Sequence, residues 1–299
     1  MKISFLWWNT SLSPAGKDRA TNEQKLYAQS MIDIFTQEIN ADFIALGEVS
    51  DNDISAITES CKLEGYNLFN GCVKAGRSHF DICALFRGDK FELLDNSSIT
   101  ANKGNRVHKI AQKLIFSIAG HDTPLHVFVS HWPSRLHRQQ NHPERASYGI
   151  RLRYAIEELF VDYGNEATLV LLGDYNDEPF DHSLSEHLMA TRDRDLAMSK
   201  PHLLYNPFWR RLGHLAPYSH DSVDLRSSSG TYFYKSGDIS RWKTFDQIIF
   251  SSKFLRGPNW RLNEQLTQIL DIPAYRELVM NPKQIFDHLP VMGVIEKVA

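Results

Sequence analysis

The sequence predicts a mixed α/β fold in which two packed β-sheets are flanked by helices. The chain opens with an apolar strand, an amphipathic helix and a second apolar strand. Later apolar segments follow one another both as hairpin-like neighbours and across a helical crossover, which is typical of mixed sheets. Because no repeat, low-complexity tract or linker interrupts residues 1–299, we expect a single domain.

The spacing of apolar residues predicts the elements in order. Ile3–Trp8 is expected to be a buried strand, and Phe43–Leu46 a second one. Between them, apolar residues on one helical face are Leu26, Met31, Ile34, Phe35 and Ile39. Further strands are predicted at Ile82–Phe86, Lys113–Ile118, Leu125–Val129, Thr168–Leu172, Thr231–Tyr234, Gln247–Phe250 and Pro290–Ile295. A helix is predicted over Tyr148–Phe160, and a long surface loop, rich in His, Arg, Asp and Pro, over His182–Arg226.

The composition is that of a globular protein, since 42% of the residues are hydrophobic and 23% are charged. The formal net charge of −3 disfavours a protein that binds nucleic acid through a continuous basic stripe. No apolar run approaches the ~20 residues that cross a bilayer, so we expect no membrane association. Cys61, Cys72 and Cys83 match no metal-binding spacing and cannot all pair, so we expect buried, reduced thiols and a cytoplasmic location.

Short polar motifs lie at the ends of predicted strands, where sites in layered folds tend to form. Each has an ordinary structural interpretation by itself, because Asn and Asp are common in turns and a loop Glu is usually solvated. Their joint occurrence favours a site instead. The motifs are Asn9-Thr10, Gly47-Glu48, Ser130 to Arg135, Gly173 to Pro179, and Phe286 to Val291.

Together these motifs hold the residue types that phosphoester hydrolysis needs. Hard divalent cations such as Mg²⁺ prefer carboxylate and amide oxygens. Attack on phosphorus also needs a positioned water and hydrogen-bond donors for the charge that develops on the phosphoryl oxygens. The donors available for these tasks are His131 and His288. The oxygen ligands available are Asn9, Glu48, Asp174, Asn176 and Asp287.

With these motifs in this order, the sequence resembles the endonuclease/exonuclease/phosphatase superfamily. That superfamily includes pancreatic deoxyribonuclease, apurinic endonucleases, neutral sphingomyelinases and inositol polyphosphate 5-phosphatases. The most specific motifs are Gly173-Asp174-Tyr175-Asn176 and Asp287-His288-Leu289-Pro290-Val291. The resemblance extends over essentially the whole chain and implies a four-layered α/β sandwich, with the site at one edge of the two sheets.

The resemblance also implies roles for the polar residues of the site. Asn9, Glu48 and Asp287 match residues that hold a divalent metal ion, Mg²⁺ or Mn²⁺, or its water shell. Asp174 matches the base that aligns or deprotonates the attacking water. Asn176 matches the amide that contacts the scissile phosphate.

Two histidines complete the implied machinery. His288 matches the histidine of the last motif, and Asp246 the carboxylate that orients it and favours its protonated form. His131 stands where relatives carry His or Tyr and is expected to protonate or hydrogen-bond the leaving oxygen, with Asp81 as its candidate partner. Many relatives carry Asn before this histidine, whereas Ser130 stands here, so an amide contact to phosphate is lost or replaced by a hydroxyl.

Basic residues cluster after His131 and beside two tryptophans. Arg135 lies near the site, and its forked guanidinium suits a phosphate, although a solvated arginine is the alternative. Basic residues interleaved with aromatics can line a nucleic-acid groove, although the tryptophans can equally be core anchors. The residues concerned are Arg138, Arg145, Arg151, Arg153, Arg210, Arg211, Arg241 and Lys243, with Trp209 and Trp242.

The sequence therefore predicts a metal-dependent phosphodiester hydrolase, with nucleic acid, DNA or RNA, as the substrate. The alternative substrate is a small or lipid-linked phosphoester such as an inositol phosphate or sphingomyelin, and the lack of an apolar membrane-inserting hairpin weakens the lipid version. A non-catalytic binding module would be favoured by the loss of a catalytic residue, and none is missing. No protein partner can be inferred.

Overall fold

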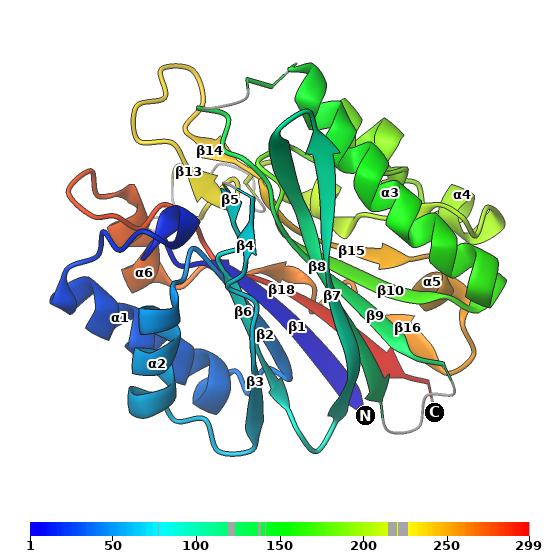
Figure 1. Cartoon of the computed structure of the whole chain (residues 1–299), viewed down its shortest axis with the longest axis horizontal. Helices are drawn as coiled ribbons and strands as arrows, with labels where there is room; N and C mark the ends of the chain where they lie inside the picture. Colours follow the sequence, from blue (N-terminus) through cyan, green and yellow to red (C-terminus); the bar gives the residue numbers. More distant parts are fainter. Residues whose placement is uncertain are drawn as a thin grey trace.

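The computed structural model describes residues 1–76, 78–118, 123–136, 139–140, 142–214, 220 and 227–298. Two seven-stranded mixed sheets face each other, with helices on their outer faces (Figure 1). The first sheet has the order β16-β18-β1-β2-β6-β3, with β17 paired to β18: β1 (Lys2–Asn9), β2 (Phe43–Gly47), β3 (Tyr66–Asn70), β6 (Ile82–Arg87), β16 (Trp260–Leu262), β17 (Gln268–Ile269) and β18 (Val291–Lys297). The second has the order β11-β12-β15-β10-β9-β8-β7: β7 (Phe91–Lys103), β8 (Arg106–Ile118), β9 (Leu125–His131), β10 (Thr168–Asp174), β11 (Ala190–Thr191), β12 (Leu204–Tyr205) and β15 (Asp246–Ser251).

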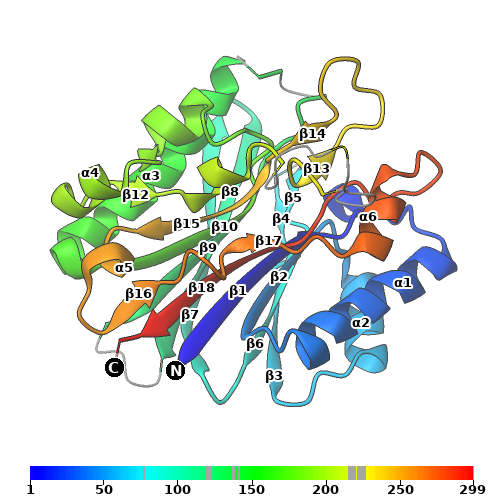
Figure 2. The ribbon, with the colours of Figure 1, turned by 180° about the vertical axis from the view of Figure 1, so that it is seen from behind.

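The helices divide between the two outer faces, as the view from behind also shows (Figure 2). The first sheet is covered by α1 (Asn22–Asp33), η2 (Ile34–Glu38), α2 (Asp51–Ser60) and α6 (Pro273–Met280). The second is covered by α3 (Pro143–Tyr163) and η4 (Ser183–His187). The remaining short elements are η1 (Pro14–Gly16), η3 (Gly164–Glu166), α4 (Arg194–Ser199), η5 (Pro207–Arg211), α5 (Lys253–Arg256) and the hairpins β4 (Lys74–Ala75) with β5 (Ser78–His79) and β13 (Tyr232–Phe233) with β14 (Trp242–Lys243). Among the described residues, no helix combines the length and apolar character needed to cross a membrane.

Alternation along the central strands explains the four layers. In β1, Phe5 and Trp7 face the second sheet, whereas Leu6 and Trp8 face the helices of the first. The central strand of the second sheet, β10, alternates in the same way between the two sheets and α3. Because both faces of these strands are buried, they are apolar almost throughout, as buried mixed sheets require. The four-layered sandwich predicted from the sequence is confirmed.

The apolar runs predicted in the sequence are strands of the structure, but several elements were missed, and β7 and α2 show why. The edge strand β7 is polar over much of its length and its pairing with β8 shifts register twice, so it carries no clean alternation. Helix α2 is only ten residues long. Its sequence signal was the capping box of Ser50 and Asp53, in which each side chain bonds the other's backbone N–H. Of the cysteines only Cys83 is fully buried, and all three thiols are free.

The predicted surface loop over residues 182–226 is wrong for its first thirty residues. This segment contains η4, β11, α4, β12 and η5, and it adds two strands to the edge of the second sheet. Leu184, Leu188, Leu204 and Phe208 are fully buried in it. Its apolar residues are spread among His, Arg and Pro in short elements, so they form no long periodic pattern. Residues 215–219 and 221–226 lie outside the described part of the chain.

The buried histidine of β9 predicts a pH-dependent stability. His126 is 2% exposed, and neither ring nitrogen has a hydrogen-bond partner among the described residues. Burial, with Lys113 nearby, lowers the pKa of His126 to about 4. As the pH falls below about 6.5, His126 binds a proton in the unfolded chain but stays neutral in the folded chain until about pH 4. We therefore expect the free energy of unfolding to fall by roughly 3 kcal/mol through this group between pH 7 and pH 4.

Urea unfolding at several pH values measures this effect. His126→Leu, similar in volume, should lose less stability on acidification than the wild type. The exposed His182, changed to Gln, should leave the pH dependence unaltered. Identical pH slopes for the wild type and His126→Leu would contradict the assignment.

Candidate active site

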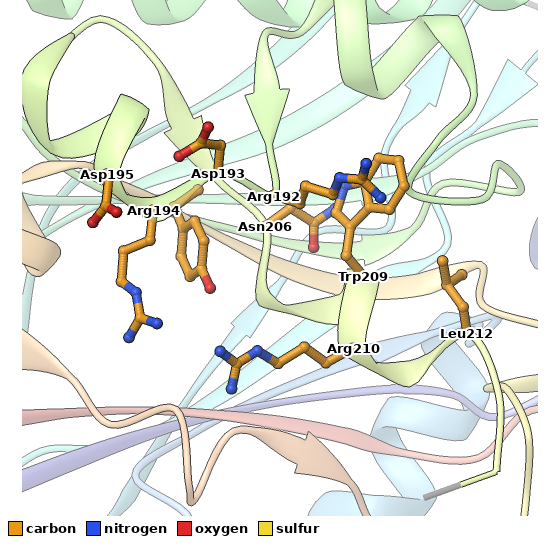
Figure 3. Close-up of a pocket in the computed structure, with 9 residues that line it drawn as sticks. Arg192, Asp193, Arg194, Asp195, Asn206, Trp209, Arg210 and Leu212 are labelled. Carbon is orange, nitrogen blue, oxygen red and sulfur yellow. The ribbon is translucent and has the colours of Figure 1, made fainter.

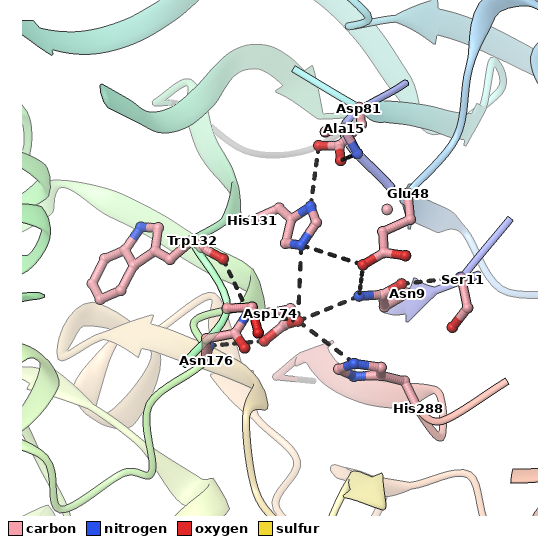
Figure 4. A network of polar contacts seen from close by, with 12 residues as sticks. Asn9, Ser11, Ala15, Glu48, Asp81, His131, Trp132, Asp174, Asn176 and His288 are labelled. Carbon is pink, nitrogen blue, oxygen red and sulfur yellow. Dashed lines mark hydrogen bonds and ion pairs between the residues drawn. The ribbon is translucent and has the colours of Figure 1, made fainter. Parts of the chain in front are cut away.

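Strand register brings the predicted catalytic residues to one end of both sheets. In the second sheet, Asp174 at the end of β10 pairs with His131 of β9 on one side and with Asp246 of β15 on the other. In the first sheet, Asn9 at the end of β1 pairs with Gly47 of β2, which directly precedes Glu48. Figure 4 shows side chains from both sheets converging on Asp174.

Asp174 is the centre of the site and is 1% exposed. Its Oδ1 accepts a hydrogen bond from the backbone N–H of Asn176 at 2.8 Å. Its Oδ2 accepts from the side-chain amides of Asn176 at 3.0 Å and Asn9 at 3.3 Å, and lies 3.7 Å from Nε2 of His288 and 4.0 Å from Nε2 of His131. Burial raises the pKa of Asp174, while His288 opposes the rise. The carboxylate is therefore held rigidly and is more basic than an exposed aspartate.

A buried dyad of Asp246 and His288 lies on one side of Asp174. The Nδ1–H of His288 donates to Oδ2 of Asp246 at 2.8 Å, which leaves Nε2 directed at Asp174. The other carboxylate oxygen accepts from the indole Nε1 of Trp7 at 2.7 Å. Burial by itself would lower the pKa of His288, but Asp246 and Asp174 raise it well above the ordinary value. The two carboxylates therefore favour the protonated ring, whose Nε2 lies 3.7 Å from Asp174.

A second dyad, Asp81 with His131, lies on the other side. Nδ1 of His131 is 3.1 Å from Oδ1 of Asp81, as the sequence predicted. The same oxygen accepts from Nζ of Lys109 at 2.8 Å, and Oδ2 accepts from the backbone of Ala15 at 2.9 Å. Burial opposes protonation of His131, but Asp81 raises its pKa to about 8. The two histidines thus approach Asp174 from opposite sides, each held by its own carboxylate.

The motif Gly47-Glu48 owes its glycine to the indole of Trp7. A Cβ at position 47 would lie 2.5 Å from Cη2 of Trp7, closer than any side chain tolerates. Glu48 then adopts a left-handed backbone with φ of 55°, a strained conformation of a kind that occurs at functional sites. Glycine therefore lets Trp7 reach Asp246, and the turn aims Glu48 at the site.

Three oxygen-bearing side chains form an acidic corner beside the two dyads. Asn9 donates to Oε1 of Glu48 at 3.3 Å, and Ser11 donates its hydroxyl to Oδ1 of Asp287 at 2.7 Å. Oε2 of Glu48 is buried and accepts no hydrogen bond from any residue that the structure describes. Burial, with Asp287 and Asp81 nearby, raises the pKa of Glu48. This unused oxygen fits a cation, because a buried carboxylate oxygen is otherwise costly to leave unpaired.

Asp174, Asp246 and His288 also place ligand atoms within 4.8 Å of one another. Both oxygens of Asp246 already accept hydrogen bonds, however, from Trp7 and His288. Nδ1 of His288 is used in the same pair. The acidic corner of Asn9, Glu48 and Asp287 is therefore better suited to hold a hard divalent cation, because its carboxylates keep free lone pairs.

Asn176 and Arg135 lie at the edge of the site, but their side chains are partly occupied. Asn176 adopts a left-handed backbone and donates to the carbonyl oxygen of Trp132 at 2.9 Å as well as to Asp174. Arg135 donates to the carbonyl oxygen of Asn176, pairs with Asp181 and lies 4.6 Å from the ring centre of Phe245. Arg135 thus fixes the loop that carries Asn176. Both side chains line a pocket of about 240 Å³ beside the dyads.

Three of the candidate phosphate contacts are buried away from the site. Ser130 precedes His131 in β9, so it points to the opposite face and is fully buried, and its hydroxyl does not replace the missing amide. Arg145 and Arg153 are buried on the inner face of α3. Arg145 pairs with Asp177, and Arg153 with Glu157. They hold the fold rather than line a groove.

The other basic and aromatic candidates lie in different parts of the structure. Arg151 is exposed on α3, and Lys243 lines the pocket beside Asn176. Trp242 packs on Phe233, as a core anchor would. Arg210 and Trp209 line a different pocket. Arg138 lies outside the described residues.

The residues that support the dyads were not predicted from the sequence. Trp7 stands two residues before Asn9, so strand alternation places both on the same face and was the available signal. Lys109 comes from β8, and nothing local marks it as the partner of Asp81. Ser11 lies in the turn after β1, with φ of 58°.

Fold and site together define a phosphoester hydrolase, and comparison with known proteins agrees. A model of the Endonuclease/Exonuclease/phosphatase family matches residues 13–273, so the chain belongs to that family. No curated protein matches the chain. Among solved structures, the human Nocturnin catalytic domain with bound sulfate is similar, with a TM-score of 0.62 and 16% identity over 99% of this chain and 95% of that one.

Two further solved structures share the fold. Truncated TDP2 of Caenorhabditis elegans has a TM-score of 0.59 and 16% identity, over 99% of this chain and 98% of that one. TDP2 of D. rerio, complexed with a single-strand DNA product, has a TM-score of 0.59 and 15% identity, over 99% of each chain. At these identities the likeness establishes the fold alone.

The role of the Asp246–His288 pair can be tested by a substitution that replaces one carboxylate oxygen with an NH₂ group. In Asp246→Asn, the amide oxygen can still accept from Trp7, but an NH₂ group then faces Nδ1 of His288 and cannot accept its proton. We expect kcat for bis-p-nitrophenyl phosphate to fall about 100-fold or more, while circular dichroism shows a folded protein. The exposed Asp195, changed to Asn, serves as the control and should keep full activity. Wild-type turnover in Asp246→Asn would show that His288 works without its carboxylate.

Proposed function

We propose that the protein is a metal-dependent nuclease that hydrolyses phosphodiester bonds of DNA or RNA. The observation that carries the proposal is the position of the pocket beside Asn176. The aromatic rings of Tyr232 and Phe245 stack on each other in its wall at 5.2 Å, and Lys243 adds a positive charge. Phe245 is covered by Tyr232 and Arg135, so the ring of this wall that stays open to a base is Tyr234, which is 40% exposed. An open ring and a cation beside the site suit a nucleotide flanking the scissile bond.

Asp174 is the base in this proposal. Asn9 and Asn176 fix the orientation of the carboxylate, and burial strengthens it as a proton acceptor. A water held by Asp174 loses a proton to it while its oxygen attacks phosphorus. In this proposal Asn176 contacts a phosphoryl oxygen, and its amide gives up the hydrogen bond to the carbonyl oxygen of Trp132 to do so.

The two histidines serve opposite sides of the reacting phosphate. His288, kept protonated by Asp246, donates from Nε2 to the charge that develops on the phosphoryl oxygens. His131, held by Asp81, donates a proton to the leaving oxygen from its own Nε2. Both rings use Nδ1 for their carboxylates, so each presents one nitrogen to the substrate.

Asn9, Glu48 and Asp287 are proposed to hold Mg²⁺ or Mn²⁺, since all of their donor atoms suitable for a cation are oxygens. When bound there, the ion neutralises negative charge on the phosphate. Glu48 is the central ligand, because its Oε2 is buried and unpaired among the described residues. Binding of the cation would relieve that unfavourable burial.

A small or lipid-linked phosphoester, such as an inositol phosphate, is the second candidate. Arg135 and Arg145 belong to the basic segment that was predicted from the sequence. Both form ion pairs, Arg135 with Asp177 and Asp181 and Arg145 with Asp177. This internal neutralisation, with the net charge of −3, leaves less free positive charge near the site than a long duplex would use.

A substrate panel separates the two candidates. Purified protein with Mg²⁺, Mn²⁺ or EDTA is presented with supercoiled plasmid, single-stranded DNA, RNA, inositol polyphosphates and bis-p-nitrophenyl phosphate. We expect metal-dependent cleavage of a nucleic acid that His288→Ala abolishes. Phosphate release from inositol polyphosphates with intact nucleic acids would move the protein to the phosphatase branch and refute the nuclease.

The metal assignment has its own measurement. Glu48→Gln keeps the size of the side chain but removes its charge, so half-maximal activity should need at least about tenfold more Mg²⁺. Isothermal titration with Mn²⁺ should show the same weakening without substrate. Glu178→Gln, a buried carboxylate that bonds the backbone of Thr244, is the matched control. An unchanged metal titration for Glu48→Gln would remove Glu48 from the metal site.

A further inference from the structure

A second and larger pocket, of about 500 Å³, lies at the edge of the second sheet and is lined by none of the catalytic residues (Figure 3). Its walls come from the turn between β11 and α4, from the start of α4, from β12 and from η5. This is the segment over residues 182–226 that the sequence predicted to be a surface loop. The pocket volume is in the range of small-ligand sites.

Two arginines of the pocket share a single carboxylate. Arg194 and Arg210 lie 3.5 Å and 3.1 Å from different oxygens of Glu264. The arginine side chains are 50% and 60% exposed, whereas Glu264 is 14% exposed. A guanidinium has five N–H donors, so one shared carboxylate leaves most of the ten donors free for a second anion. Glu264 therefore attracts both guanidinium groups by charge, while its Oε1 has no hydrogen-bond partner among the described residues and most of the arginine donors stay open.

An aromatic platform lies next to these arginines. The guanidinium of Arg192 sits over the indole of Trp209 at 4.8 Å from the ring centre. Nε1 of Trp209 is buried and has no hydrogen-bond partner among the described residues. Figure 3 shows Arg192 and Trp209 together on one side of the pocket and the heads of Arg194 and Arg210 on the other. The pocket thus offers a flat aromatic surface next to N–H groups that can donate hydrogen bonds to an anion.

We propose that this pocket is a non-catalytic nucleotide site. The phosphate is held by Arg194 and Arg210, since a guanidinium fork matches phosphate oxygens. The base packs on the platform of Trp209 and Arg192. The nucleotide is either a free one or the distal nucleotide of a bound strand, and the second case rests on the proposed nuclease function.

Hydrogen bonds join the pocket to the active-site loop. Asn206, in the pocket wall, donates its amide to Oε1 of Gln247 at 2.7 Å, and Gln247 donates to the carbonyl oxygen of Asp177 at 2.7 Å. Trp209 also contacts the ring of Phe180 at 6.3 Å between ring centres. Asp177 and Phe180 follow Asn176 in the same loop. The pocket therefore adjoins the loop that carries Asn176, through buried hydrogen bonds and the ring contact of Trp209 with Phe180.

Charge in the pocket is balanced rather than strongly positive. Asp193 is already used, because its carboxylate caps α4 by accepting from the backbone of Leu196. Asp195 and Glu264 offset the remaining arginine charge. Phosphate binding thus depends on the positions of free donors and not on a long-range field. This arrangement suits a single phosphate group better than a polyanion.

Binding of adenosine 5′-monophosphate in EDTA tests the site directly. Titration calorimetry should show saturable binding to the wild type and equally to His288→Ala. Adenosine and inorganic phosphate, which each lack one half of the ligand, should bind at least about tenfold more weakly. Arg194→Gln/Arg210→Gln should lower the affinity for the nucleotide about tenfold or more, because it removes both guanidinium groups. Arg151→Gln/Lys283→Gln removes the same charge elsewhere and should change nothing.

A second variant is expected to change the affinity for the nucleotide in the opposite direction. Glu264→Gln removes the anion that competes for the two guanidinium groups, so the affinity for adenosine 5′-monophosphate should rise. Absence of saturable nucleotide binding, or equal affinities in the wild type and both pocket variants, would overturn the proposal. These measurements need no turnover, so they stand even if the nuclease function fails.

Kinetics distinguish the two sources of the nucleotide. If the distal end of a strand occupies the pocket, Arg194→Gln/Arg210→Gln raises KM for a single-stranded oligonucleotide and leaves kcat and the hydrolysis of bis-p-nitrophenyl phosphate unchanged. If only the affinity for free nucleotide falls, the pocket serves a free nucleotide. A loss of bis-p-nitrophenyl phosphate hydrolysis would place the arginines in the catalytic machinery and contradict a separate site.

Discussion

The site depends on one buried carboxylate that joins the two sheets. Asp246, from the second sheet, accepts from Trp7 of the first sheet and from His288 in the loop before β18. Three distant segments of the chain therefore meet at fully buried hydrogen bonds, which are strong where the local dielectric is low. This contact sets the ring of His288 and the distance between the sheets at the catalytic end. Gly47 permits it by leaving room for the indole.

Around this contact, pairing along β10 arranges the rest. Asp174 stands between His131 and Asp246 because β9, β10 and β15 are aligned at their ends, and a shift by one residue would turn Asp174 away from the site. The turns that follow are strained, since Glu48 and Asn176 both adopt left-handed backbones. The dense hydrogen bonding of the loop after β10, through Arg145 to Asp177 and Tyr175, holds that strain.

The distribution of arginine charge separates structural from binding roles. Arg145 and Arg135 form ion pairs with carboxylates next to the active site, where they fix the loop that carries Asn176. Arg194 and Arg210, at the edge of the second sheet, share one carboxylate and keep donors exposed. The same residue type thus rigidifies one region and leaves another able to bind an anion. Desolvation decides the difference, because a buried guanidinium must be paired whereas an exposed one need not be.

The sequence alone determined the strand cores and the residue types of the candidate site. Strands buried on both faces are nearly continuous apolar runs, so Ile3–Trp8 and Thr168–Leu172 could be predicted from the local sequence. The polar motifs that end these strands could be found in the same way. The pairing of Asp246 with His288 was predictable only through the family resemblance, and that of Asp81 with His131 from the expected position of the strand that Asp81 opens. Tertiary structure decided the rest: the support from Trp7 and Lys109, the burial of Arg145, and the folding of residues 183–211 into a sheet edge with a pocket. These features depend on contacts between segments far apart in the chain, and no local spacing encodes which side chain a distant strand will present.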